Sequence, residues 1–237
     1  MTEKIGTHAM ILAAGLGLRM RPLTDHKPKP LIEVAGKPLI DYGMDRLREA
    51  GVQRVVVNGH YRAEQILLWS KRQQAPDVVF SDEQAEILDT GGGIAKALPL
   101  LGEQPFFVLN SDSFWIEGRV PTLNRLRGAW NDATTDCLLL LCLVDRTIGY
   151  DGQGDFFLGR DGRLIRQKGS GALAYIGGYL VHPRLFAGVA VEKFSMNVLW
   201  DKAISEGRLH GIAHSGKWLH VGTPAAIALA EAELAKT

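Results

Sequence analysis

The sequence has few cysteines, almost no net charge and no long apolar run. Its 237 residues include two cysteines, and the formal net charge is +1 at pH 7. The longest apolar stretch, around residues 137–144, is far shorter than the roughly 20 residues that a membrane span needs. Residues 9–14 lead straight into a glycine loop, which is not the pattern of a secretory signal. We therefore expect a cytoplasmic protein that binds neither membranes nor nucleic acid.

The two cysteines, Cys137 and Cys142, lie in the same apolar run. In a strand, a spacing of five places them on opposite faces, which makes a disulfide between them unfavourable. No CxxC motif or nearby histidine accompanies them, so a metal site is disfavoured as well. We predict two buried thiols in a reducing compartment.

Strand-like and helix-like segments alternate over the first 145 residues. The expected strands are 8–14, 54–58, 78–81, 105–110 and 135–144, and the expected helices are 38–50, 63–73, 91–98 and 120–130. The strands are near-continuous apolar runs, which is typical of strands buried on both faces. The pattern predicts an α/β fold with three layers around a mostly parallel sheet.

The pattern changes after about residue 145. Residues 151–171 are rich in Gly, Asp and Arg, with short strand-like pieces such as 155–158. Strands are expected at 174–182 and 218–221, and helices at 195–205 and 224–234. With no internal repeat or long linker, we expect a single domain over 1–237. Its nucleotide-binding half would end near residue 145, and a smaller closing half, about 146–237, would supply substrate contacts.

A glycine loop with a basic tail is the strongest local signal. It reads Leu12-Ala-Ala-Gly-Leu-Gly-Leu-Arg-Met-Arg21, and Lys29 follows between two prolines. Glycines after a strand let backbone N–H groups approach a phosphate chain. The dinucleotide fingerprint and the P-loop both fail here, because Met20 replaces the third glycine and no Gly-Lys-Ser/Thr follows. Basic residues suit a triphosphate that loses pyrophosphate, although a turn with solvated charges would look similar.

The segment from Leu12 to Leu31 closely resembles the signature of the sugar-nucleotide pyrophosphorylases, also called nucleotide-diphospho-sugar transferases. That signature reads L-A-A-G-x-G-x-R-(M/L)-x-P-x-T, then P-K-P-(L/M). Further matches lie at 34–40, 88–93, 109–112 and 218–224, so the resemblance covers about residues 8–235. It implies a Rossmann-like fold with a smaller sugar-binding lobe. It also implies an enzyme that joins a sugar-1-phosphate to a nucleoside triphosphate and releases pyrophosphate.

Residues 90–102, 154–156 and 177–186 resemble a short bacterial branch of that family. That branch transfers uridylyl from UTP to N-acetylmuramate-1-phosphate in peptidoglycan recycling. Guanylyl transfer to mannose- or heptose-1-phosphate stays open, because backbone contacts read the base. A non-catalytic nucleotide-sugar sensor is the alternative of another class. The C-terminal β-helix of some members is absent, so we expect a monomer rather than an oligomer.

The resemblance also implies site residues. The expected catalytic pair is Arg19 and Lys29. The expected nucleotide contacts are this pair with Leu12, Ala14, Gly15, Gly17, Asn58, Gly91 and Gly92, while Arg21, Asp82 and Glu83 stay open. The expected sugar-phosphate contacts are Asp155, Gly177 and Asn197, of which Asn197 rests on its polarity at a helix start, where capping is the alternative.

A magnesium ion is the expected cofactor. Asp112 follows a buried strand, where open α/β sheets place ligands, although it could instead cap a turn. The family has a second carboxylate in W-x-D-(I/V)-G-T-P, where this chain has His220. Three roles stay open for His220: a direct metal ligand, a contact to a metal-bound water or phosphate oxygen, or packing beside Trp218. We expect the second, because Mg²⁺ commonly keeps several waters.

Overall fold

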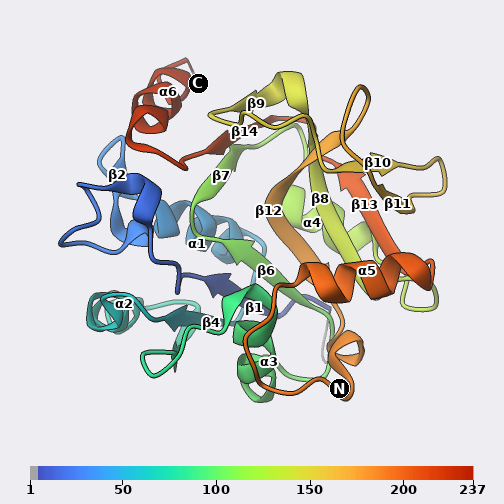
Figure 1. Ribbon diagram of the computed structural model, residues 1–237, viewed down its shortest axis with the longest axis horizontal. Helices are drawn as coiled ribbons and strands as arrows, with labels where there is room; N and C mark the ends of the chain where they lie inside the picture. Colours follow the sequence, from blue (N-terminus) through green and yellow to red (C-terminus); the bar gives the residue numbers. More distant parts are fainter. Residues whose placement is uncertain (1–4, 237) are drawn as a thin grey trace.

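The computed structural model describes residues 5–236, and a nine-stranded sheet runs through its centre (Figure 1). The strands follow the order β5–β4–β1–β6–β12, and β12 continues both to the hairpin β10–β11 and to the pair β8–β13. Their bounds are β1 (His8–Leu12), β4 (Arg54–Gly59), β5 (Asp77–Asp82), β6 (Phe106–Asn110), β8 (Cys137–Leu143), β10 (Phe156–Leu158), β11 (Leu164–Arg166), β12 (Leu173–Val181) and β13 (Leu209–Ala213).

The sheet is parallel in its first half and mixed beyond it. Strands β6, β1, β4 and β5 are mutually parallel, so their carboxyl ends lie at one edge. Strand β12 enters antiparallel between β6 and β8, and β8 pairs in parallel with β13. The expected α/β fold with a mostly parallel central sheet is confirmed. The antiparallel insertion of β12 could not be seen in the apolar pattern of its sequence.

Six helices and four 3-10 turns surround this sheet in the described part of the chain. They are α1 (Leu39–Glu49), α2 (Ala63–Ser70), α3 (Asp89–Leu101), α4 (Thr122–Ala129), α5 (Asn197–Ser205) and α6 (Pro224–Leu234), with η1 (Leu18–Met20), η2 (Lys29–Leu31), η3 (Val144–Arg146) and η4 (Pro183–Phe186). No helix within residues 5–236 is long and apolar enough to cross a membrane.

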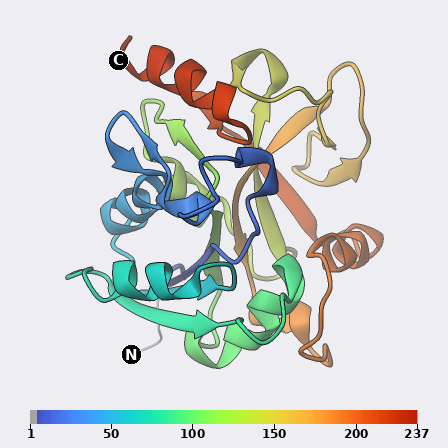
Figure 2. The ribbon, with the colours of Figure 1, turned by 60° about the vertical axis from the view of Figure 1, so that its left-hand side comes forward.

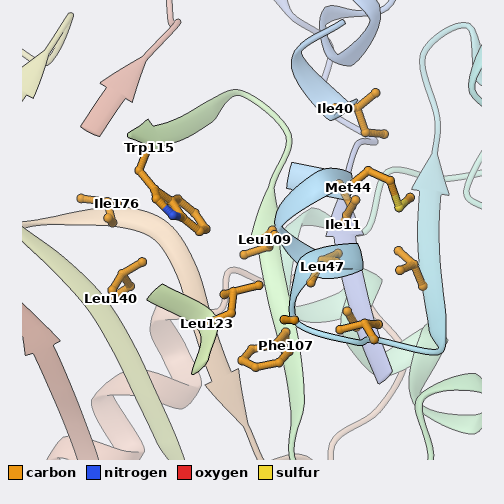
Figure 3. Packing of buried hydrophobic residues seen from close by; sticks show 14 of the residues in the cluster. Ile11, Ile40, Met44, Leu47, Phe107, Leu109, Trp115, Leu123, Leu140 and Ile176 are labelled. Atoms are coloured by element: carbon orange, nitrogen blue, oxygen red, sulfur yellow. The ribbon is translucent and has the colours of Figure 1, made fainter. Parts of the chain in front are cut away.

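Two apolar cores lie on opposite faces of the sheet. One core packs α1, α2 and α4 against it, and Figure 3 shows α1 side chains over the strands. The other core packs α3 and α5 against the opposite face. Cys142 belongs to the first core and Cys137 to the second, and both thiols are buried and free, as predicted. Burial raises the pKa of the Cys142 thiol to about 11.

Short strands form two further sheets. One has the order β7 (Ser113–Ile116), β14 (Lys217–His220) and β9 (Thr147–Ile148), and the other pairs β2 (Glu33–Val34) with β3 (Lys37–Pro38). A third apolar cluster joins these sheets to α6. In two views α6 lies at the end of the molecule opposite α3 (Figure 1, Figure 2). Because β14 pairs with β7, it places His220 beside the chain that leaves β6.

The predicted helices and strands all occur, most of them with shifted ends. Helix α3 begins at Asp89, two residues before the predicted start at the glycines. Asp89 has a positive φ of 60°, so the turn into the helix is made by an aspartate. Strands β2, β3, β7, β9 and β13 were not predicted. They are short, and β13 is buried through its pairing with β8.

Candidate active site

Two adjoining cavities open at the carboxyl end of the parallel strands. The first, of about 430 Å³, lies over the ends of β1, β4 and β6. The second, of about 400 Å³, lies between β12, the hairpin β10–β11 and α5. Leu12, Asp89, Thr90 and Asn110 line both cavities, so these share a border. Volumes of this size suit small molecules, and open α/β sheets bind ligands at this edge.

The glycine loop is clamped where it leaves β1. The Ala13 backbone N–H donates to Asn58 Oδ1 at 2.7 Å, and Ser111 Oγ donates to the Leu12 carbonyl at 2.7 Å. The two contacts come from the strands on either side of β1. They hold Leu12, Ala14 and Gly15 along the first cavity, where the sequence predicted nucleotide contacts.

Asn58 is buried, and its side chain is engaged within the protein. It lines the first cavity, and its Nδ2 donates to Glu83 Oε1 at 2.7 Å. Glu83 is buried too; burial raises the pKa of its carboxyl, and the Asn58 bond partly offsets this. Asp82 is exposed and accepts from the Gln84 N–H at 2.8 Å. The structure thus gives Asn58 and Glu83 a bracing role, whereas a contact of Asn58 with a nucleotide stays a prediction.

The basic loop after Gly15 is folded by hydrogen bonds to its backbone. Thr24 Oγ1 donates to the Gly17 carbonyl at 2.9 Å, and a Cβ on Gly17 would lie 3.1 Å from the Lys29 Cβ. Tyr61 donates to the Thr24 carbonyl at 2.8 Å, and Gln65 donates to the His26 carbonyl at 2.9 Å. These contacts, two of them from the start of α2, hold the loop so that Lys29 lines the first cavity.

Lys29, Asp112 and His220 meet at the edge of this cavity. Lys29 Nζ lies 2.9 Å from Asp112 Oδ2, and His220 Nε2 lies 3.9 Å from the same oxygen. Burial acts to raise the pKa of the Asp112 carboxyl, but Lys29, His220 and Arg19 more than offset it, so the pKa falls below its ordinary value. Asp112 is therefore ionised at neutral pH.

His220 stacks on Trp218, with ring centroids 5.3 Å apart and an interplanar angle of 17°. Burial lowers the pKa of the imidazole, Lys29 and Arg19 lower it further, and Asp112 opposes them. The ring is neutral at pH 7. His220 packs on Trp218, which is one of its three possible roles. It also lies near Asp112, so a contact to a metal-bound water or phosphate oxygen stays a prediction.

The two loop arginines differ in their surroundings. Arg19 is exposed and is not among the residues that line either cavity, although its charge lowers the pKa of both Asp112 and His220. Arg21 forms an exposed ion pair with Asp25 at 3.5 Å. In this conformation Lys29 is therefore better placed than either arginine to contact a phosphate in the first cavity.

Gly91 and Gly92 lie under a segment from the other half of the chain. Their N–H groups donate to the Phe194 carbonyl at 2.9 and 3.2 Å. A Cβ on Gly92 would lie 2.0 Å from the Glu192 carbonyl oxygen, so only glycine allows this approach. Neither glycine is among the lining residues. The structure gives them a packing role, and their contact with a base stays a prediction.

The predicted sugar contacts separate in the structure. Asp155 lines the second cavity, and its Oδ2 accepts from the Tyr175 N–H at 2.9 Å. Asn197 lines it too and donates to Ser195 Oγ at 3.1 Å. Asn197 does not cap α5, because the residue at the cap position is Met196. Gly177, with φ +81°, sits where β12 is irregular and packs against Asn110 and Ser113, outside the lining of either cavity.

Several lining residues escaped the sequence reasoning. Lys193 lines the first cavity, and Arg166 and Lys168 line the second. Thr90, which belongs to the matched segment 88–93, borders both cavities and accepts from the Met196 N–H at 2.8 Å, which ties α3 to the start of α5. The local signal for Arg166 and Lys168 was a cluster of basic residues in a Gly-rich stretch, which is also typical of a solvated loop.

The residues around Asp112 suit a magnesium ion that is coordinated mostly by water and by the phosphate oxygens of a bound substrate. Within residues 5–236 no group of three or more His, Cys, Asp or Glu side chains could hold a metal. Asp112 offers a hard carboxylate, and His220 offers a nitrogen instead of the oxygen that Mg²⁺ prefers. Mg²⁺ is commonly bound by one or two carboxylates with phosphate oxygens and water, and Asp112 fits that pattern.

A family model described as nucleotidyl transferase matches residues 8–138, more than half of the chain. The chain belongs to the nucleotidyl transferase family. N-acetylmuramate alpha-1-phosphate uridylyltransferase of Caulobacter vibrioides is 44% identical over 235 residues, 96% of this chain and 97% of that protein. The protein of the same name from Neisseria meningitidis serogroup B is 37% identical and covers 91% of this chain and 93% of its own. This protein is thus an enzyme of the sugar-nucleotide-forming kind.

The fold of the nucleotidyl transferase is found in solved structures as well. HddC from Yersinia pseudotuberculosis, complexed with GMP-PN, superposes with a TM-score of 0.76. It covers 96% of this chain and 99% of its own, at 22% sequence identity. At that identity the likeness concerns the fold alone, and it agrees with the Rossmann-like arrangement expected from the sequence.

Proposed function

We propose that this nucleotidyltransferase transfers uridylyl from UTP to N-acetylmuramate-1-phosphate. The observation that carries the proposal is the 44% identity, over nearly the whole of both chains, to the Caulobacter enzyme of that name. The two cavities with a common border support it, because the reaction needs a nucleotide and a sugar phosphate side by side. The first cavity would hold UTP, and the second would hold the sugar.

The reaction requires positioning and charge neutralisation more than proton transfer. A phosphate oxygen of the sugar forms a bond to the α-phosphorus of UTP, and the bond from that phosphorus to the bridging oxygen breaks. Pyrophosphate leaves with the electron pair. The nucleophile is already an anion, so no general base is needed. Lys29, at the edge of the first cavity, would neutralise charge on the phosphates, and Arg19 would join it when the nucleotide is bound.

Asp112 would hold Mg²⁺, and the substrate phosphates would complete its coordination. The ion, when bound, supplies positive charge against the phosphate oxygens. Lys29 already pairs with Asp112 at 2.9 Å, so the ammonium and the ion would share one carboxylate. His220, neutral and stacked on Trp218, would accept from or donate to a water near that carboxylate.

The cellular setting is part of the proposal. The buried free thiols of Cys137 and Cys142 fit a reducing compartment, which supports the cytoplasm. A UDP-linked N-acetylmuramate is a cell-wall precursor, so the reaction would return recovered sugar to wall synthesis. We expect the protein to be a monomer, which sedimentation or gel filtration with light scattering would test.

Pyrophosphate release tests the function directly. Purified protein with Mg²⁺ is given UTP, GTP, CTP, ATP or dTTP, each paired with N-acetylmuramate-, N-acetylglucosamine-, mannose- and heptose-1-phosphate. We expect the highest kcat/KM for UTP with N-acetylmuramate-1-phosphate. A preference for GTP with mannose- or heptose-1-phosphate would favour guanylyl transfer instead. Nucleotide binding without turnover in any pair would favour a sensor.

A further inference from the structure

The second cavity has an aromatic wall that the reaction itself does not require. Trp200 makes edge contacts with Tyr175, Tyr179 and Phe156 at centroid distances of 4.9, 5.5 and 6.2 Å. All four side chains line this cavity, and none of them lines the first. Such a wall suits apolar substituents, such as methyl groups, on the sugar that the cavity receives.

A buried hydroxyl in this wall finds no hydrogen-bond partner among the described residues. Tyr179 is 1% exposed, and its hydroxyl makes no hydrogen bond within residues 5–236. Burial raises the pKa of this hydroxyl well above its ordinary value, so it remains a donor. Buried donors are nearly always satisfied, and an oxygen of a bound ligand is a natural partner here. The cavity therefore offers a hydrogen-bond donor beside its apolar wall.

Arg166 brings a guanidinium to the same cavity. Its Nε donates to Asp201 Oδ1 at 2.8 Å, and its Cζ lies 5.0 Å from the centroid of the Phe156 ring. Its two terminal nitrogens make no hydrogen bond in the described part of the chain. An arginine that is paired through Nε and lies over a ring keeps its terminal donors as a fork, which suits a carboxylate.

The position of Arg166 separates it from the reacting phosphates. Lys29 and Asp112 line the first cavity but not the second, whereas Arg166 lines the second but not the first. The anomeric phosphate must reach the shared border, because it reacts with the nucleotide. An anion that meets Arg166 would therefore be a second one, on another carbon of the sugar. N-acetylmuramate carries such a group, the carboxylate of its lactyl ether, next to a methyl group.

The acidic residues that line this cavity are engaged by other groups and do not pair with Arg166. Asp155 is engaged by the Tyr175 N–H at 2.9 Å and by the Tyr150 hydroxyl at 3.3 Å. Asp89 accepts from the Thr90 N–H at the border of the two cavities. Lys168 is the second cation of this cavity.

We infer that Arg166 binds the lactyl carboxylate of the sugar in a bidentate manner and thereby selects N-acetylmuramate-1-phosphate over N-acetylglucosamine-1-phosphate. This inference rests on the proposed function and names the residue that would give it sugar specificity. The aromatic wall would take the methyl group of the lactyl ether. Arg166 is then a specificity-determining residue that contacts the substrate away from the reacting atoms.

Arg166→Met tests the inference with three ligands. The KM of N-acetylmuramate-1-phosphate is measured by pyrophosphate release at saturating UTP. Inhibition constants against it are measured for N-acetylglucosamine-1-phosphate and for the N-acetylmuramate-1-phosphate analogue whose lactyl carboxylate is an amide. A lost charge-assisted fork should raise the KM about 10- to 100-fold, while the two inhibition constants change less than about threefold.

Two further variants are compared with Arg166→Met. Arg163→Met is the matched control, because Arg163 precedes the same strand, pairs with Asp161 at 3.7 Å and lies outside the lining of both cavities. It should leave all three constants unchanged. Arg166→Lys keeps the charge but loses the fork, so it should raise the KM selectively but by less, and it serves if Arg166→Met does not fold.

The outcomes separate the inference from the function beneath it. If the wild-type protein does not use N-acetylmuramate-1-phosphate, the proposed function fails. If it does, but the Arg166 variants shift the KM and both inhibition constants equally, or not at all, the carboxylate contact is overturned and the function stands. An equal selective loss in Arg163→Met would also overturn it, because a general charge effect would then explain the result.

Discussion

The two cavities share a border but are built in different ways. The first lies over the ends of parallel strands and presents Lys29 and Asp112 on short segments braced by hydrogen bonds to backbone. The second is walled by aromatic rings from a strand, a hairpin and a helix. On the proposed function, the first would meet the charge that every nucleotide brings, and the second would meet the shape of one sugar. Substitutions in the first cavity should therefore lower turnover with every sugar phosphate, whereas substitutions in the second should change the choice of sugar.

The largest effect is expected at the basic residues near the first cavity. Lys29→Ala and Arg19→Ala should each lower kcat/KM by about 10²-fold or more, the scale of one lost charge contact in the transition state. Steady-state pyrophosphate release with each sugar phosphate would measure it, and the loss should be similar for all of them. Lys27→Ala is the matched control, since Lys27 pairs with the exposed Glu33 at 3.6 Å. Near wild-type turnover in Lys29→Ala would remove Lys29 from the mechanism.

The next largest effect should appear in the second cavity, where substitution of the buried Gly92 should raise the KM of the sugar phosphate. In Gly92→Ala the new Cβ would lie 2.0 Å from the Glu192 carbonyl, so the segment before α5 must move. Ser195 and Asn197 line the second cavity, and a displacement of about 1 Å can cost up to about 10²-fold. We expect the KM of the sugar phosphate to rise about tenfold or more and that of UTP to rise less.

Gly128→Ala in α4 is the control for this substitution. A Cβ there meets nothing within 4 Å, and alanine is favoured over glycine in a helix by about 1 kcal/mol. Thermal unfolding should show Gly128→Ala neutral or stabilised and Gly92→Ala destabilised by about 1–3 kcal/mol, the usual cost of overpacking. Equal rises in both KM values for Gly92→Ala would mean that the two cavities are not separable in this way.

A smaller effect should appear in metal binding. His220→Asp adds a carboxylate near Asp112, which should tighten Mg²⁺ binding without nucleotide by about tenfold, because Mg²⁺ prefers oxygen ligands. Calorimetric titration of Mg²⁺ into both proteins would measure it. Asp112→Asn, made in each background, should abolish the binding. Equal affinity in the wild-type and His220→Asp proteins would mean that position 220 does not face the ion.

The smallest effect is expected at Arg21. Its ion pair with Asp25 is exposed on both sides, and such pairs contribute about 0–1 kcal/mol. Arg21→Ala should change kcat/KM less than about threefold and leave the melting temperature unchanged. Comparison with Arg19→Ala in the same assay would decide the matter. A loss as large as that of Arg19→Ala would show that the whole basic loop folds over the nucleotide.

The sequence named more of the residues that line the first cavity than of those that line the second. Leu12, Gly15 and Lys29 lie within about 20 residues of one another, and their pattern is readable because backbone contacts to phosphate demand that spacing. Asp112 follows a strand whose burial is visible in its apolar run. Arg166, by contrast, lies in a Gly- and Asp-rich stretch that reads as a loop, and Tyr179 reads as one more residue of a buried strand.

In the fold, too, features set by local sequence were predicted, whereas features set by distant contacts were not. Helix α6 (Pro224–Leu234) has the predicted ends, because a proline begins it and a run of alanines follows. The start of α3 was misplaced because Gly91 and Gly92 accommodate residues 192–194, about a hundred positions away. Nothing local signals such a contact. The position of β12 between β6 and β8 is likewise a matter of tertiary pairing.

The place of β12 has a consequence for how the chain folds during synthesis. In residues 5–236 strand β8 pairs with β12 and β13, both of which are made after it. Until residues 173–181 leave the ribosome, β6 has an open edge and β8 has no neighbour. Open strand edges favour association with other chains. A fragment that stops near residue 145 should therefore aggregate instead of folding as a nucleotide-binding unit, and the two halves of the sequence should become native together.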